Sequence, residues 1–384
     1  MKVDPQKNKQ RYFNWIEKIK GRIPDISKAS SDIILKYILD MERGLNISKS
    51  SIKGARSYAR LNNIRQRMVF IVKEFEERFN IKDIRVISEE QIFVFFNDMR
   101  NGKIQKKQGG IYKSVADYVK VFKSFWHWHI KVEKKKGSKI IDIAEDLDTS
   151  REKPKWVYLT EEQIKQLCDN AKYNYRMIIM FLYDSGVRSP SELINIKTSD
   201  FHKDFKEVEV RDEISKTFGR RIKLMFCSSM IKEYIKIMGI GPDDRVFDIK
   251  PTSVNKYLQR LAKKVLGDKM SLAGKKYSEL TMYHFRHCSC CYWLPRYKSE
   301  SSLKYRFGWK ESDKIHYYSE FLGMVDTISE EDMLVDVTKT EIEQRLLKSE
   351  NEKEVLLERV GMLEGQMKEI LEFVKKGELV VSLN

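Results

Sequence analysis

The sequence has few cysteines and no long apolar segment, and each scarcity excludes a class of protein. Cysteine occupies five of the 384 positions, an odd number without paired spacing, which argues against a disulfide framework and favours a reducing compartment. No run approaches the ~20 apolar residues that span a bilayer, and the longest, near 177–182, is far too short. The first residues form no apolar signal region. We therefore expect a cytoplasmic protein with no membrane partner.

Fingerprints of nucleotide and metal sites are missing as well. Gly274-Lys275 lacks both the upstream glycine and the following Ser or Thr of a P-loop, and no Rossmann glycine pattern occurs. One group of residues suggests a metal site: His284, His287, Cys288, Cys290 and Cys291. This group does not follow the paired C-x-x-C arrangement, and cysteine on a helix also serves as a small apolar residue. We therefore expect no cofactor and no metal.

Positive charge is what the sequence has in excess. The net charge is +17, from 73 Lys and Arg against 56 Asp and Glu, and it favours a polyanionic partner. Nucleic acid is the first candidate and an anionic membrane surface is the second. With 41% hydrophobic and 34% charged residues, the composition is that of a globular protein with much solvated surface. The length exceeds one ordinary core, so we expect two or three domains.

Apolar residues at helical spacing dominate the N-terminal part. The periodicity predicts helices over residues 32–41, 63–79 and 115–130, and the capping-box pattern Ser88-Glu-Glu-Gln91 predicts the start of another. The basic, glycine-containing stretch 101–110 predicts a loop.

A stretch with little periodicity, 131–155, contains Lys134-Lys-Lys-Gly-Ser-Lys139 and predicts a linker. Regular structure resumes with a second capping box, Thr160 to Gln163. Alternating apolar residues over 207–210 and 221–226 predict a small hairpin or sheet. Helical patterns surround it, over residues 173–186, 229–238, 254–265 and 282–293.

The C-terminal tail has a different pattern, a heptad seam with alternating spacings of four and three. Its apolar members are Ile342, Leu346, Leu356, Val360, Leu363, Met367, Ile370 and Val374. Ser349 and Lys353 interrupt the seam with polar side chains. The pattern predicts a coiled coil that supports assembly, and the alternative is a single helix packed on the preceding domain.

Two arginines lie in local patterns that suit a phosphate. Arg188 lies in Asp184-Ser-Gly-Val-Arg-Ser-Pro-Ser-Glu192, after a predicted helix end, and Glu192 is a natural partner to orient it. Arg286 lies in Thr281-Met-Tyr-His-Phe-Arg. A phosphodiester repels nucleophiles, and two permanently charged guanidinium groups can neutralise its non-bridging oxygens as the transition state forms. The competing interpretation is that both are ordinary surface arginines.

Three further residues complete the candidate set. Lys216 lies in the predicted hairpin, Trp309 follows a glycine, and Tyr318 comes nine positions later. A phenol that attacks phosphorus forms a phosphotyrosine that keeps the bond energy, so a strand can be resealed without ATP. Each residue also has an ordinary interpretation, as a solvated lysine, a core tryptophan or one of 18 tyrosines. Tyr317 is the adjacent alternative nucleophile.

The order of these motifs resembles the tyrosine recombinase (phage integrase) family, and most of all its archaeal members. The motifs are Arg188, Lys216, Tyr283-His-Phe-Arg286, Gly-Trp309 and Tyr318. The likeness covers about residues 60 to 325 and is strongest in the second half. It implies a site-specific recombinase, or integrase, that cuts and rejoins duplex DNA through a 3′-phosphotyrosine without metal or ATP.

The resemblance also implies a role for each residue. Lys216 matches the family's general acid, which protonates the leaving 5′ oxygen, and Tyr318 matches the usual spacing of the nucleophile from Gly-Trp. Trp309 occupies a position where members have His or Trp, and its indole either donates to a phosphate oxygen or packs against the tyrosine helix. Members commonly have His three residues before the second arginine. Here that residue is Tyr283, so either Tyr283 donates the hydrogen bond or the adjacent His284 serves.

We therefore expect a mainly α fold with a small β-sheet (α+β), in which a helical SAM-like core-binding domain and a tyrosine-recombinase catalytic domain precede a heptad helix. The expected parts are an N-terminal helical arm (1–55), the core-binding domain (56–133), a basic linker (134–155), the catalytic domain (156–335), a coiled-coil-like helix (336–376) and a tail (377–384). The implied partners are a double-stranded DNA recombination site and further copies of the chain, as a tetramer on DNA, which would make the protein nucleoid-associated.

Two other functions fit part of the pattern. A type IB topoisomerase-like enzyme would use the same chemistry without exchanging DNA partners, but the helical N-terminal part and the short interval between Arg286 and Tyr318 favour a recombinase. A DNA-binding relative with an inactive site is the second alternative, and Tyr283 in place of the usual His is its only support.

Overall fold

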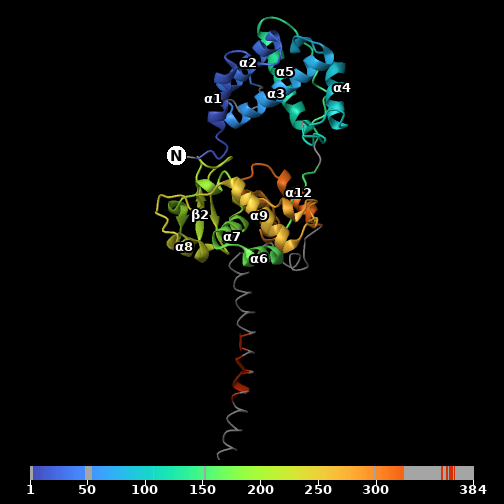
Figure 1. Cartoon of the computed structure of the whole chain (residues 1–384). Helices are drawn as coiled ribbons and strands as arrows, with labels where there is room; N and C mark the ends of the chain where they lie inside the picture. The colour runs from blue at the N-terminus through green and yellow to red at the C-terminus, as the bar shows by residue number, and fades with distance from the viewer. Residues whose placement is uncertain are drawn as a thin grey trace, which may run out of the picture. The chain divides into compact units, whose positions relative to one another are not determined.

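The computed structural model of the chain describes residues 3–47, 54–106, 108–150, 153–297 and 299–323, together with 356–357, 360–361, 363–365 and 367 (Figure 1). Its N-terminal part contains α1 (Asn8–Ile19), α2 (Lys28–Arg43), α3 (Tyr58–Phe79), α4 (Glu89–Arg100) and α5 (Val115–Lys135). The predicted helices of this region are confirmed. Ser88 and Gln91 form the predicted capping box at the start of α4.

Aromatic side chains fill the core that these helices share. Phe75 of α3 meets Phe95 of α4 edge to face, with ring centroids 4.8 Å apart. Trp128 of α5 donates its indole N–H to the buried carboxylate of Asp40 in α2 at 2.8 Å, so the polar end of the ring is satisfied. Tyr12 of α1 belongs to the same core. Helices α1 and α2 therefore pack with α3 to α5, and the expected boundary at residue 55 stays a prediction.

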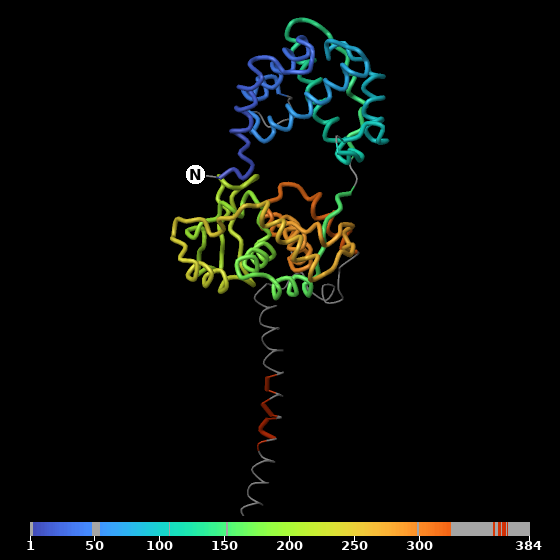
Figure 2. Tube along the Cα trace, viewed as in Figure 1, coloured from blue at the N-terminus to red at the C-terminus, as the bar shows by residue number. Residues whose placement is uncertain are grey.

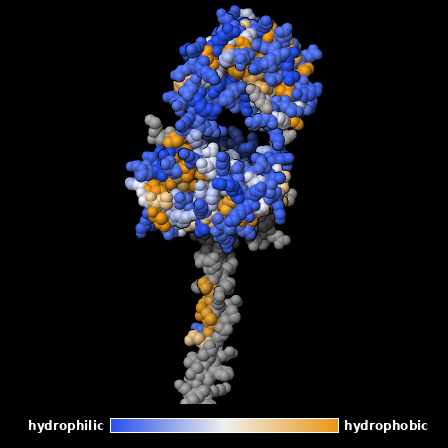
Figure 3. Space-filling model, in the orientation of Figure 1, coloured by the Kyte–Doolittle hydropathy of each residue, from blue (hydrophilic) through white to orange (hydrophobic). Residues whose placement is uncertain are grey.

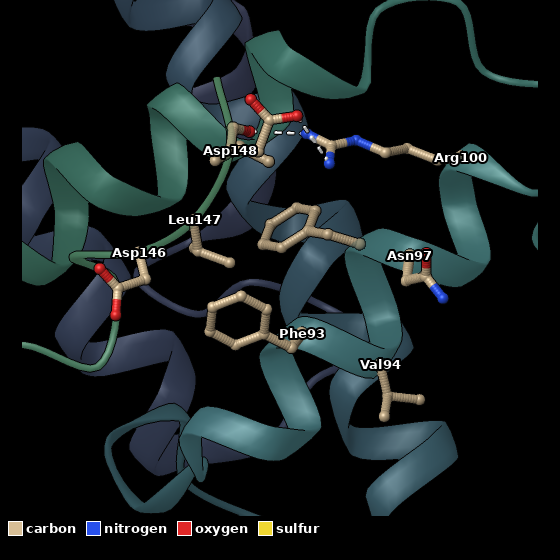
Figure 4. A pocket seen from close by; sticks show the side chains of 9 residues that line it. Phe93, Val94, Asn97, Arg100, Asp146, Leu147 and Asp148 are labelled. Carbon is tan, nitrogen blue, oxygen red and sulfur yellow. Dashed lines mark hydrogen bonds and ion pairs between the residues drawn. The ribbon is translucent and has the colours of Figure 1, made fainter. Parts of the chain in front are cut away.

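The segment after α5 returns to this helical core. Trp126 donates to the carbonyl of Ile141 at 3.1 Å, and Arg100 of α4 reaches the carbonyl and carboxylate oxygens of Asp148 at 2.6 and 2.9 Å. Figure 4 shows Arg100 beside Asp148 at the edge of a pocket of about 380 Å³ that Phe93 and Leu147 also line. Part of the stretch expected to be a linker is thus packed against α4 and α5.

The second part of the chain combines helices with one small sheet. Its helices are α6 (Glu161–Asn170), α7 (Tyr173–Ser185), α8 (Ser228–Ile237), α9 (Pro251–Leu266), α10 (Met282–Trp293), α11 (Glu300–Phe307) and α12 (Asp313–Phe321). Short 3-10 turns in this part cover Leu193–Asn195, Thr198–Asp200, Tyr277–Glu279 and Leu294–Arg296, and one in the N-terminal part covers Ile84–Val86. Thr160 and Gln163 form the second predicted capping box. Helices α7 and α10, drawn green and orange in Figure 2, pack against each other. Arg188 follows the end of α7, and Arg286 lies on α10.

The predicted sheet is present but ends earlier than expected. Strands β1 (Phe201–His202), β2 (Glu207–Val210) and β3 (Arg220–Lys223) pair antiparallel in that order. The alternation predicted a strand over 221–226, whereas β3 begins at Arg220 and stops at Lys223. The physical reason is that the backbone N–H groups of residues 225–227 donate to the buried carboxylate of Asp184 instead of to a neighbouring strand.

The fold class is therefore the predicted one, mainly helical with a small antiparallel sheet. Most of the predicted heptad seam lies outside the described residues. Within them, Leu356, Val360, Leu363 and Met367 are exposed, and Figure 3 shows an orange stretch of the tail there. Across the described part of the chain, every helix is too short or too polar to cross a bilayer.

Candidate active site

A buried carboxylate between two arginines is the foundation of the site. Arg188 lies just after the C-cap of α7, and its guanidinium Nη1 donates to Glu192 Oε1 at 2.7 Å while its backbone N–H donates to Oε2 at 2.8 Å. Arg220, the first residue of β3, donates from Nη2 to Glu192 Oε2 at 2.8 Å. The pairing of Arg188 with Glu192 predicted from the sequence is thus present.

Glu192 is ionised in this environment. Burial by itself raises the pKa of this carboxyl, but the hydrogen bond and charge of Arg220, followed by those of Arg188, outweigh burial and lower the pKa to about 2. The side chain is fully buried, so the carboxylate has no water to compete with the two guanidinium groups. Arg188 is consequently held at two atoms, which fixes the direction of its guanidinium.

Arg220 is a site residue that sequence reasoning missed. Its side chain is fully buried, and besides Glu192 it donates from Nε to the carbonyl of Arg306 at 2.8 Å. A signal for it exists in the strand pattern, because Ile222 faces inward and a period of two places Arg220 on the same face. A charged residue at an inward position needs a partner, and Glu192 is that partner.

Arg286 of α10 joins the same cluster. Its guanidinium donates to the carbonyl of Gly186 and to that of Phe307, each at 2.5 Å, and lies over the Phe307 ring. Burial and the neighbouring charge of Arg188 lower the pKa of Arg286 to about 10, so it remains a cation at neutral pH. The structure therefore brings together the two arginines that the sequence proposed as a pair.

The C-terminus of α11 holds this cluster in place. Arg188 donates to the carbonyl of Gly308 at 2.7 Å, directly after the Phe307 carbonyl that Arg286 binds. Gly308 has a φ of 61°, and a Cβ there would lie 2.9 Å from Arg220 Nη1 and 3.2 Å from Arg188 Nη1. Glycine is required at this position because any side chain would strain the backbone and crowd both guanidinium groups.

Lys216 lies on the loop between β2 and β3. Its side chain is exposed, and among the described residues it makes no hydrogen bond or ion pair. The next residue, Thr217, donates its hydroxyl to the Gly308 carbonyl at 2.8 Å. The loop that carries Lys216 is thereby tied to the same carbonyl as Arg188.

Tyr318 of α12 is enclosed by aromatic rings. Its phenol is stacked on Trp309, with ring centroids 6.0 Å apart, and meets the edge of Trp156 at 6.2 Å. The residue is only 4% exposed, and burial raises its pKa well above the usual value. The hydroxyl forms a hydrogen bond of 2.5 Å with His287 Nδ1. His287 is thus a second residue that the sequence argument did not place in the site.

Trp309 and Tyr317 have packing roles in this arrangement. The Trp309 ring stacks between Phe307, at 4.9 Å, and Tyr318, so it links the arginine cluster to the tyrosine helix. Tyr317 donates its hydroxyl to the carbonyl of Pro154 at 2.9 Å and accepts from Trp156 Nε1 at 2.8 Å. Its hydroxyl is used to anchor the chain before α6, which distinguishes it from Tyr318.

The structure also separates Tyr283 from His284. His284 is buried, and its Nδ1 accepts the backbone N–H of Thr281 at 3.1 Å, closing the first turn of α10. Burial, together with the charge of Lys275, lowers the pKa of His284 to about 4, so the ring is neutral. Tyr283 is 47% exposed, with its ring edge on His287. The accessible residue of the two is Tyr283.

A basic groove lies on α5, in the N-terminal helical part. It has a volume of about 840 Å³, and no Asp or Glu lines it. The basic side chains that line it are Arg56, Lys120, Lys123, His127, Lys131, Lys134 and Lys135. Within the described part of the chain, none of these Lys and Arg side chains forms an ion pair. Lys123 and Lys131 donate to backbone carbonyls, at 2.7 and 2.5 Å, which orders the ammonium groups without neutralising them.

The histidines and cysteines of α10, which the sequence suggested as a possible metal site, lie mostly buried in the helix packing. All three cysteines of α10 are buried free thiols, and burial raises the pKa of Cys288 to about 12. Over the ranges that the structure describes, no three His, Cys, Asp or Glu side chains are grouped so that they could hold a metal ion.

Comparison with known proteins gives a family match over part of the chain and a shared fold. Residues 157–321 match the model of the phage integrase family, and this range contains all seven candidate residues. The search of curated proteins gave no match. A lambda integrase dimer bound to a COC′ core site is similar in structure, with a TM-score of 0.55 and 16% identity over 82% of this chain and 83% of that one.

Two further solved structures are similar. A Tn1549 transposon integrase in complex with a circular intermediate DNA has a TM-score of 0.53 and 13% identity over 75% of this chain and 93% of that one. XerH site-specific recombinase bound to a difH substrate has a TM-score of 0.52 and 12% identity over 84% and 90%. At these identities the comparison establishes a shared fold.

The central role of Glu192 can be tested by Glu192→Gln. The variant leaves the buried guanidinium of Arg220 and the partly buried one of Arg188 without a carboxylate, so we expect the free energy of unfolding at pH 7 to fall by about 3–5 kcal/mol. Because the pKa of Glu192 is about 2 when folded, against about 4.3 when unfolded, its contribution is complete above pH ~4.3 and lost as the pH falls towards 2.

Urea titrations at pH 7, 5, 4 and 3 measure both effects. The wild type should lose stability below pH ~4.3 that Glu192→Gln has already lost. Glu209→Gln is the matched control, since Glu209 lies on β2 and pairs with Arg221 in a partly exposed position, where a loss under about 1 kcal/mol is expected. The same pH dependence in wild type and Glu192→Gln would contradict the assignment.

Proposed function

We propose that the protein is a site-specific DNA recombinase, an integrase that cuts and rejoins duplex DNA through a 3′-phosphotyrosine on Tyr318. The observation that carries the proposal is the convergence of Arg188 and Arg286 on adjacent carbonyls of α11, next to a tryptophan that stacks on Tyr318. The match of residues 157–321 to the phage integrase family and the shared fold support it.

The arginines would bind the phosphodiester to be cut. Both are cations at neutral pH, and their present partners at α11 are neutral carbonyl oxygens, which a phosphate oxygen would outcompete because it carries charge. Glu192 keeps Arg188 oriented throughout. Neutralising the non-bridging oxygens lowers the barrier to attack by a nucleophile, so positioned charge supplies the main catalytic effect.

Each chemical step replaces one phosphoester bond with another. The phenolic oxygen of Tyr318 forms a bond to phosphorus and releases its proton, while the bond from phosphorus to the 5′ oxygen breaks. Lys216 donates a proton to that oxygen, which leaves as a hydroxyl. A 5′ hydroxyl from the partner duplex then attacks the phosphotyrosine, and Tyr318 is released with a proton returned to it. One phosphoester replaces another, so neither ATP nor a metal is consumed.

Tyr283 is assigned the hydrogen bond to the phosphate that a histidine makes in most of the family. The assignment rests on exposure, because Tyr283 is exposed whereas His284 is buried and its Nδ1 accepts the backbone N–H of Thr281. Trp309 is assigned to pack the tyrosine helix against the arginine cluster. The family's histidine and this tyrosine share the ability to donate one hydrogen bond.

The proposed partner is a double-stranded recombination site, bound partly through the basic groove on α5, and the acting form is a tetramer on DNA. The helical N-terminal part is assigned as the SAM-like core-binding domain, and the heptad tail as a coiled coil between copies. Likeness to archaeal members and association with the nucleoid rest on the sequence. Exchange of strands between two DNA sites distinguishes a recombinase from a type IB topoisomerase-like enzyme, which relaxes supercoils without exchange.

Covalent trapping tests the nucleophile. Incubation with nicked duplexes without metal should give a protein–DNA adduct on a denaturing gel for wild type and Tyr317→Phe, and none for Tyr318→Phe. Tyr317→Phe is the matched control because it removes a neighbouring hydroxyl that hydrogen-bonds to Pro154 and Trp156 and not to His287 Nδ1, the partner of Tyr318. Fragments flanking the gene belong among the substrates. Tight DNA binding without an adduct on any substrate would favour the inactive DNA-binding alternative.

The leaving group tests Lys216. Lys216→Ala should slow adduct formation by about 10²- to 10⁴-fold, the usual contribution of a general acid. Sulfur in place of the bridging 5′ oxygen should restore most of the rate, because a thiolate leaves without a proton. Lys223→Ala, at the exposed end of β3, should behave as wild type on both substrates. A defect in Lys216→Ala that sulfur does not relieve would remove the general-acid role.

Salt dependence tests the basic groove. Replacing Lys120, Lys134 and Lys135 with Gln should weaken duplex binding and reduce the slope of log K against log salt by about 2–3, because each phosphate contact contributes about 0.9. The control triple is Lys18, Lys28 and Lys36 on α1 and α2, exposed lysines with the same total change of charge. Equal losses in both triples would show a general charge effect and exclude the groove as a specific contact surface.

A further inference from the structure

The hydroxyl of Tyr318 has a protein partner, His287 of α10. His287 Nδ1 lies 2.5 Å from the phenolic oxygen, and the two residues come from different helices, α10 and α12. The His287 ring is itself fixed, because it stacks on Trp156 with centroids 4.8 Å apart and receives the edge of Tyr283 at 5.1 Å. A rigid acceptor therefore meets the atom that is assigned to attack phosphorus.

We propose that His287 is a positioning residue that holds Tyr318 in a buried resting position, and that DNA must displace this hydrogen bond before Tyr318 attacks. The inference rests on the proposed role of Tyr318 as nucleophile. It assigns the neighbour of Arg286 on α10 a function of its own, the control of when the nucleophile becomes available.

Burial shows why the contact is a resting state. Tyr318 is 4% exposed and is enclosed by Trp309, Trp156 and His287. A phosphodiester in a duplex is bulky and hydrated, so it cannot reach a phenolic oxygen that is shielded from solvent and already hydrogen-bonded. The phenol must leave His287 to meet a phosphate bound by Arg188 and Arg286.

The pKa values argue against His287 as the base that activates Tyr318 in this position. Burial, followed by the charges of His284 and Arg286, lowers the pKa of His287 to about 3, whereas burial raises that of Tyr318 above its usual ~10. The two shifts run in opposite directions, so the proton stays on the phenol. The pair is therefore a neutral donor and a neutral acceptor, which suits holding rather than deprotonation.

Two substitutions separate the hydrogen bond from ring packing. His287→Phe keeps a flat ring on Trp156 but removes the acceptor, whereas His287→Asn places a carbonyl oxygen near the position of Nδ1 and loses the ring. The first readout is nitration of Tyr318 by tetranitromethane in the DNA-free protein, mapped by mass spectrometry, with Tyr305, which is 47% exposed, as internal reference. Thermal unfolding confirms that each variant is folded.

We expect His287→Phe to raise the nitration of Tyr318 relative to Tyr305 by about fivefold or more, since both shielding and the raised pKa suppress the reaction in the wild type. His287→Asn should return it to within about twofold of the wild type, because an acceptor is again present. Unchanged nitration in a folded His287→Phe, or equal increases in both variants, would overturn the proposal.

The second readout is single-turnover adduct formation at saturating DNA. A resting contact that DNA must break predicts that His287→Phe forms the adduct at least as fast as the wild type. A tenfold or greater loss with unchanged DNA binding would show that His287 acts in the chemical step and would overturn the resting-state role. Failure of the wild type to form an adduct would contradict the proposed function. Nitration does not depend on activity, so its result tests the Tyr318–His287 contact independently.

Discussion

The buried contact of Glu192 with Arg188 and Arg220 is the interaction on which the rest of the site depends. One carboxylate faces two guanidinium groups, and Arg286 adds a third cation whose hydrogen bonds go to neutral carbonyls. Burying a charge is costly unless it is paired, and here three guanidinium groups share one carboxylate. The cluster therefore has unbalanced positive charge. The phosphate proposed as the ligand would supply the negative charge that the cluster lacks.

The C-terminus of α11 fixes the orientation of the charged side chains. The carbonyls of Phe307 and Gly308 accept from Arg286, Arg188 and Thr217, which come from three segments far apart in the sequence. The last carbonyls of a helix carry partial negative charge and are left without partners inside the helix, so they suit cations and hydroxyl donors. A glycine at the end of the helix allows the close approach, which explains why Gly-Trp is a useful signal in the sequence.

The parts of the site that the sequence predicted are those governed by local chemistry. Arg188 and Glu192 lie four residues apart, so their pairing could be proposed from spacing alone, and the capping boxes at Ser88 and Thr160 follow from short patterns. Arg220 and His287 were missed because their partners are distant in the chain. The predicted strand over 221–226 was too long for the same reason, since Asp184 of α7 captures the backbone N–H groups beyond it.

The arginines and the proposed nucleophile, Tyr318, are in different environments, and the ring of Trp309 lies between them. The guanidinium groups are charged and oriented, whereas Tyr318 is neutral, buried and bound to His287. The Trp309 ring stacks on Phe307, whose carbonyl accepts from Arg286, and it also stacks on Tyr318. The proposed phosphate would draw Arg286 and Arg188 from the carbonyls of Phe307 and Gly308, which lie directly before Trp309 in the chain. Trp309 is therefore the contact that joins the proposed phosphate-binding arginines to the proposed nucleophile.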